Sequence, residues 1–73
     1  MNVEVKQLIK EEMVKIREKV KKVYPYVKQY LEKHNPELII LYDDYYKKVM
    51  EADPVVAMEY AYRILRLYVE IMQ

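Results

Sequence analysis

Six common residue types are missing from this sequence of 73 residues: glycine, serine, threonine, cysteine, phenylalanine and tryptophan. The lack of cysteine excludes disulfide bonds, and the lack of serine, threonine and cysteine together excludes the usual side-chain nucleophiles of covalent catalysis. Glycine, serine and threonine are also weak helix formers. Their absence therefore predicts a chain that is built almost entirely of helix.

Long apolar runs and a large excess of one charge are absent as well. No uncharged run is longer than five residues, as in Leu38 to Tyr42, whereas a membrane span needs about 20 apolar residues. We therefore expect a soluble protein with no transmembrane segment and no signal peptide. The formal net charge of +1 argues against a nucleic-acid partner. The length predicts one domain, residues 1–73, near the lower size limit for folding without disulfides or metal.

No residue pattern predicts catalysis or a bound metal. The only histidine, His34, falls in the last turn of the first expected helix, where the helix dipole favours a cation. Asp43 and Asp44 are adjacent, so they diverge by about 100° on a helix, and each has a lysine four residues later with which to pair. We expect no catalytic, cofactor-binding or metal-binding residue, no cofactor and no small-molecule substrate, and hence no enzyme.

The first segment reads as one long helix from about Val3 to Lys33. Its apolar side chains form a stripe centred on Ile16, and the stripe stays in phase on both sides of Pro25. Because Pro25 lies about 180° from Ile16, we interpret this segment as one helix bent at Pro25. A break at Pro25 is the alternative, since an unbroken helix would be about 45 Å long. The basic residues beside the stripe are interpreted as a solvated face: Lys15, Arg17, Lys19, Lys21 and Lys22.

Two joints define the remaining helices. Asn35 precedes Pro36 and Asp53 precedes Pro54, so each joint offers a capping side chain followed by proline at the first helical position. These signals predict helices over residues 36–52 and 54–73. The fold class is therefore all-α, a three-helix bundle in which the second and third helices form an antiparallel hairpin and the first packs across both. The expected core consists of Ile9, Ile16, Val20, Val23, Val27, Leu38, Tyr42, Val49, Ala57, Ala61, Ile64 and Tyr68.

The third helix has almost no polar face. Its strongly polar residues, Glu59, Arg63, Arg66, Glu70 and Gln73, fall within an arc of about 80°. A helix that covers one flank of a small bundle needs an apolar stripe of only about 100° or slightly more. The expected core leaves a second apolar stripe uncovered, at spacings of three and four, which we take as the interface: Val55, Met58, Tyr62, Leu65, Val69 and Met72.

A sequence that omits six residue types, among them the weak helix formers glycine, serine and threonine, resembles de novo designed helical bundle proteins, in which helix positions are filled by propensity. A natural protein from a thermophile or an archaeal virus is the alternative. The resemblance implies a structural role without catalysis.

Three hypotheses follow for the second stripe. The first is a closed homo-oligomer that associates through it. The second is a designed binder that presents this stripe, or the tyrosine-rich face of the second helix, to a target protein. The third is a monomer whose bent first helix covers both sides of the third helix.

Overall fold

The structure, a computed structural model, describes residues 3–73. Three α-helices account for nearly all of them: α1 spans Val3–His34, α2 spans Ile39–Glu51 and α3 spans Pro54–Met72. A short 3₁₀ turn, η1, covers Pro36–Leu38 and leads directly into α2. Residues 3–73 contain no strand. The all-α three-helix fold is confirmed, with a 3₁₀ turn where the second helix was expected to begin as α-helix.

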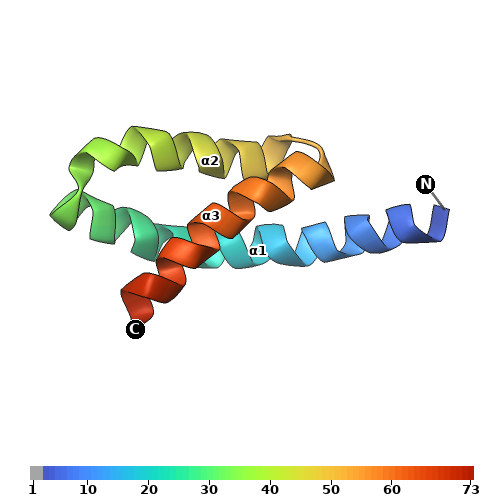
Figure 1. Cartoon of the computed structure of the whole chain (residues 1–73), viewed down its shortest axis with the longest axis horizontal. Helices are drawn as coiled ribbons and strands as arrows, with labels where there is room; N and C mark the ends of the chain where they lie inside the picture. The colour runs from blue at the N-terminus through green and yellow to red at the C-terminus, as the bar shows by residue number, and fades with distance from the viewer. Residues whose placement is uncertain (1–2) are drawn as a thin grey trace.

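The helices form two layers. Helices α1 and α2 run antiparallel beside each other, and α3 begins beside the end of α2, crosses in front of α1 and contacts both (Figure 1). Because α1 has 32 residues while α2 has 13 and α3 has 19, its N-terminal part extends beyond the other two helices (Figure 1). The resulting shape is long and thin, with principal extents of 45, 23 and 14 Å.

Pro25 does not break α1. The helix continues through this residue to His34, so the alternative of two separate helices is wrong. Pro25 is exposed outside the core, at the edge of a shallow surface hollow that Asp43 and Tyr46 of α2 also line. The in-phase apolar stripe on both sides of Pro25 was therefore a better guide to this helix than the proline itself.

The core lies where α3 crosses the other two helices. Its buried residues are Met13, Val20, Tyr24, Val27, Leu31, Val49, Ala57, Ala61 and Ile64. On α1 the buried face is turned by about 50° from the expected centre at Ile16, so that Met13, Tyr24 and Leu31 are enclosed while Ile16 and Val23 are only half-buried. The buried face is rotated in this way because α2 packs against the flank of α1 that carries Tyr24.

The two joints differ in how they cap the following helix. The Asp53 side chain accepts hydrogen bonds from the main-chain N–H of Val55 at 3.1 Å and of Val56 at 3.3 Å, as expected for a capping residue. The Asn35 side chain makes no cap, and its amide donates instead to Oε1 of Glu37 at 3.1 Å. The expectation of a side-chain cap at Asn35 is therefore wrong, although the helix boundary there is correct to within a few residues.

The side chain of Arg17 connects α1 to the end of α2. Its Nε donates to the carbonyl oxygen of Val49 at 2.8 Å, and its Nη2 donates to that of Ala52 at 2.9 Å. These oxygens belong to the last turn of α2, where helical carbonyls have no partner within the helix. Arg17 was expected on a solvated face, and it is instead half-buried as the cation that closes α2.

Candidate functional site

The second apolar face of α3 is largely uncovered in the folded chain. We call Val55, Met58, Tyr62, Leu65, Val69 and Met72 the α3 stripe. Five of the six are exposed, between 39% for Met58 and 70% for Val55. The exception is Leu65, which is half-buried and packs against the core. The structure thus leaves this stripe facing outward, and its use as an interface stays a prediction.

The C-terminal half of the stripe is slightly hollowed and has a charged border. A shallow depression of about 470 Å³ is lined by Tyr62, Leu65, Arg66, Val69, Glu70 and Gln73. Along the border, Arg66 Nε lies 3.7 Å from Glu70 Oε1, and Arg63 Nη2 lies 3.5 Å from Glu59 Oε1. These exposed pairs contribute little to stability, so their charges are available to a partner at small cost.

The overhanging part of α1 carries further exposed apolar side chains. We call residues 3–12 the α1 arm, in which Val3 is 80% exposed and Leu8 is 59% exposed. The arm meets the start of α3 at an apolar hollow of about 190 Å³, lined by Lys6, Ile9, Lys10, Pro54 and Val55. Because Val55 belongs to both features, the hollow and the α3 stripe form one continuous apolar surface.

Other exposed apolar residues lie outside these two features. Ile40 and Val14, which fit neither the core nor the stripe in the sequence, are 84% and 61% exposed, and Ile40 stands among the charged residues of α2. Single exposed apolar side chains are common on folded proteins and indicate no site.

A tyrosine cluster fills the groove between α2 and α3. The Tyr45 ring lies 5.0 Å from Tyr42 and 5.3 Å from Tyr60, measured between ring centroids, and the Arg63 guanidinium sits over both Tyr45 and Tyr60. Burial, with a smaller contribution from neighbouring Tyr45, raises the pKa of Tyr42. These contacts are internal to the chain, so they support the packing of α2 on α3 rather than a ligand site.

A second polar group lies between α1 and α2. The Tyr24 hydroxyl donates to Asp43 Oδ1 at 2.5 Å, Lys28 Nζ lies 3.4 Å from Asp43 Oδ2, and the Tyr24 ring stacks on Tyr46 at 4.7 Å. Burial, followed by the hydrogen bond to Asp43, raises the pKa of the Tyr24 hydroxyl above its ordinary value. Asp43 was expected to pair with Lys47 four residues later, and it bonds to α1 instead. Asp44 does pair with Lys48, as expected.

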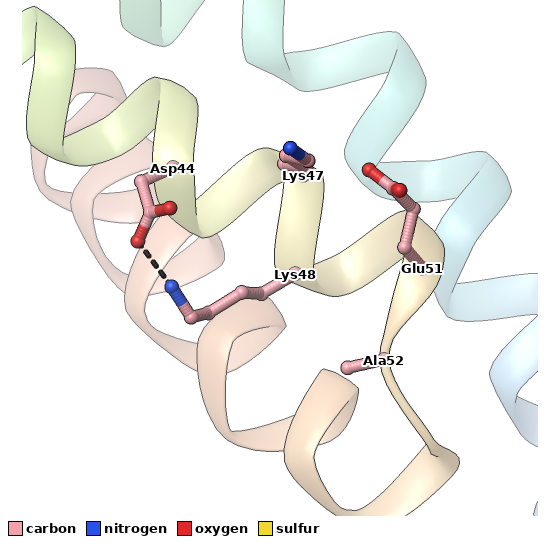
Figure 2. A pocket seen from close by; sticks show the side chains of 5 residues that line it. All are labelled: Asp44, Lys47, Lys48, Glu51 and Ala52. Carbon is pink, nitrogen blue, oxygen red and sulfur yellow. Dashed lines mark hydrogen bonds and ion pairs between the residues drawn. The ribbon is translucent and has the colours of Figure 1, made fainter.

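The open surface at the end of α2 is lined by charged side chains of that helix. Figure 2 shows the open surface at the end of α2, where Asp44 bonds to Lys48 while Lys47 and Glu51 extend in other directions and do not converge with that pair. Residues 3–73 contain no cluster of three or more histidine or acidic side chains that could hold a metal ion. Within the same residues, no helix is both long enough and apolar enough to cross a membrane.

Comparison with protein families, with characterised proteins and with solved structures gives no significant match.

Proposed function

We propose that this protein is a structural, self-associating helical protein, which forms a closed homo-oligomer through the α3 stripe and carries out no catalysis. The observation that supports this most directly is the exposure of the stripe, which places apolar side chains in water along the whole length of α3. A continuous exposed apolar face of this length is typical of a subunit contact.

The dimensions of the chain also support association. A compact monomer of 9.0 kDa should expose about 4,900 Å² of surface, and this chain exposes 5484 Å². Its radius of gyration is 13.2 Å, compared with about 11 Å for a compact domain of this length. The excess of roughly 600 Å² reflects an elongated chain that leaves more surface uncovered than a compact monomer does.

We further propose that the sequence is a de novo design. Its support is compositional and local: six residue types are omitted, and the joints between helices have only one residue, Asn35, and two residues, Ala52 and Asp53. Designed bundles use strong helix formers and short connections in this way.

The proposal is tested by measuring molecular mass in solution, using light scattering after size-exclusion chromatography at micromolar concentration. We expect a mass that is a whole multiple of 9.0 kDa and larger than one chain. A single species of one chain would contradict self-association.

Replacing Tyr62 and Val69 with glutamate should produce the monomer, because both side chains are exposed and the change places charge in the interface. The matched control is Ile40→Glu, which is exposed outside the stripe and should leave the mass unchanged.

A designed binder for another protein is the second candidate. The composition of the stripe favours it, because Tyr62, Met58 and Met72 are of the types enriched in protein interfaces. This candidate predicts a monomer that stays folded alone, so the same mass measurement separates the two functions.

A further inference from the structure

We infer that the partner on the α3 stripe is a second copy of this chain, paired through α3 in antiparallel orientation, with Met72 of each copy seated in the hollow between the partner's α1 arm and α3. This inference rests on the proposed self-association and specifies its geometry.

The charge pattern at the border of the stripe favours an antiparallel pair. The stripe runs from Val55 to Met72, so its midpoint lies between residues 63 and 64. Glu59 and Arg66 lie on the same border, about 20° apart around the helix, and their midpoint lies between residues 62 and 63. A two-fold axis near the centre of the stripe therefore brings Glu59 of each copy close to Arg66 of the other, twice over.

A parallel pair offers no such match. In a parallel pair the two-fold axis runs along the two α3 helices. Rotation about this axis moves the border that carries Glu59 and Arg66 to the other side of the interface. The charged border of one copy therefore faces the uncharged border of the other. On that opposite side α3 carries no charged residue: Ala61 is buried in the core, Leu65 and Tyr68 are half-buried, and α1 adjoins Pro54. Glu59 and Arg66 would then have no charged partner on the facing α3, so a parallel pair lacks the charge match of the antiparallel one.

The hollow beside the α1 arm supplies the second observation. An antiparallel pair centred on the stripe places Met72 of one copy opposite Val55 of the other. Val55 lines the hollow of about 190 Å³, together with Ile9, Pro54 and the stems of Lys6 and Lys10. Met72 is 64% exposed in the single chain, and an unbranched, flexible thioether is well suited to fill an irregular apolar space.

The antiparallel pair also buries more than the α3 stripe. The α3 stripe alone is one helix face, but the antiparallel arrangement adds the hollow and the exposed side chains of the arm at both ends of the seam. In this dimer the α1 arm contacts the C-terminal end of the partner's α3.

Disulfide trapping tests the orientation, because the sequence has no cysteine of its own. Val55→Cys and Met72→Cys are placed at opposite ends of the stripe, both at exposed positions where the substitution leaves the core intact. In the antiparallel dimer, equal residues of the two copies are about 26 Å apart, whereas a disulfide requires Cα atoms within about 7 Å. Each variant alone should therefore give no covalent dimer on oxidation. The two variants unfolded and refolded together should give a covalent dimer of one Val55→Cys chain and one Met72→Cys chain, in up to about half of the material by random pairing.

The outcomes separate this inference from the proposed function. A monomeric mass in the unmodified protein overturns both. An oligomeric mass in which each single variant links to itself supports self-association and overturns the antiparallel geometry. An oligomeric mass with no linkage in the mixed sample places the contact away from the ends of α3 and also overturns this inference.

Discussion

The guanidinium of Arg17 donates to the carbonyl oxygen of Val49, a residue that follows it by 32 positions and lies in the last turn of α2. A second hydrogen bond from the same side chain reaches Ala52, the residue at the C-cap of that helix. One cation on α1 therefore supplies two partners for carbonyls that α2 itself cannot satisfy. This contact fixes the position of α2 along α1 more specifically than apolar packing can.

Replacing Arg17 with alanine should destabilise the fold by about 1 to 3 kcal/mol, because two part-buried carbonyl oxygens lose a charged donor. Arg17→Lys should recover only part of the loss, since an ammonium group lacks the planar fork that reaches both oxygens. The free energy of unfolding can be measured by chemical denaturation followed by circular dichroism. Lys19→Ala, at an exposed position two residues later, is the control and should change stability by less than about 0.5 kcal/mol. Equal effects at the two positions would contradict the capping role of Arg17.

Ile64 and Ile40 offer a matched pair for locating the core. Ile64 is fully buried at the crossing of the helices, and Ile40 is 84% exposed. Ile64→Ala should cost about 2 to 5 kcal/mol and leave a marginal fold, because it removes apolar contact and opens a cavity. Ile40→Ala should be nearly neutral or slightly stabilising, because alanine is the better helix former. Thermal unfolding of both variants checks the difference, and a tolerant Ile64 would show that α3 does not cross the bundle as described.

Removing the Tyr24 hydroxyl tests the link between α1 and α2. Tyr24→Phe keeps the ring that stacks on Tyr46 but loses the hydrogen bond to Asp43, so we expect a loss of about 1 kcal/mol. Tyr26→Phe, on an exposed ring two residues away, should have little effect. The measurement is again the free energy of unfolding, and similar values for the two variants would argue against a stabilising Tyr24 to Asp43 bond.

The raised pKa of Tyr24 predicts a loss of stability in alkaline solution. Below about pH 10 the hydroxyl is protonated in both the folded and the unfolded chain, and its contribution to stability is fully present. As the pH rises above 10, the unfolded chain ionises while folded Tyr24 keeps its proton, so stability falls, by up to about 1.4 kcal/mol per pH unit for this group. Tyr42, whose pKa is also raised, acts in the same direction.

Comparing the unmodified chain with Tyr24→Phe isolates that contribution. Unfolding measured at pH 8, 10 and 11 should show a smaller alkaline loss in the variant, because one of the two shifted tyrosines is gone. An identical pH dependence in both proteins would show that Tyr24 is not the group responsible.

The helix boundaries could be predicted because they depend on local chemistry. The pairs Asn35-Pro36 and Asp53-Pro54 mark the joints whatever the tertiary structure, and the third helix begins at Pro54 as predicted. Most of the expected core of α3 was also correct: Ala57, Ala61 and Ile64 are enclosed, whereas Tyr68 is only half-buried.

The details of α1 could not be predicted because they depend on where α2 lies. A helix wheel locates the centre of an apolar stripe, but it does not show that two neighbours pack off-centre and enclose Tyr24 rather than Ile16. The same limit applies to polar contacts. Sequence spacing assigns Asp43 to Lys47, whereas the fold offers it Tyr24 and Lys28 on another helix. Arg17 gave no local signal at all, because its acceptors are main-chain oxygens more than 30 residues away.

The unequal length of α1 gives a single helix two very different environments. Around Val27 its backbone is enclosed by the packed core, so those amide hydrogens should exchange with solvent only when the whole molecule unfolds. Toward Val3 the same helix exposes most of its apolar side chains, so its turns should fray at a much lower free-energy cost. Local stability therefore rises steadily along α1 from its first turn to its middle. The N-terminal turns of α1, which open most easily, therefore belong to the same helix as the region around Val27, which is the most protected from exchange.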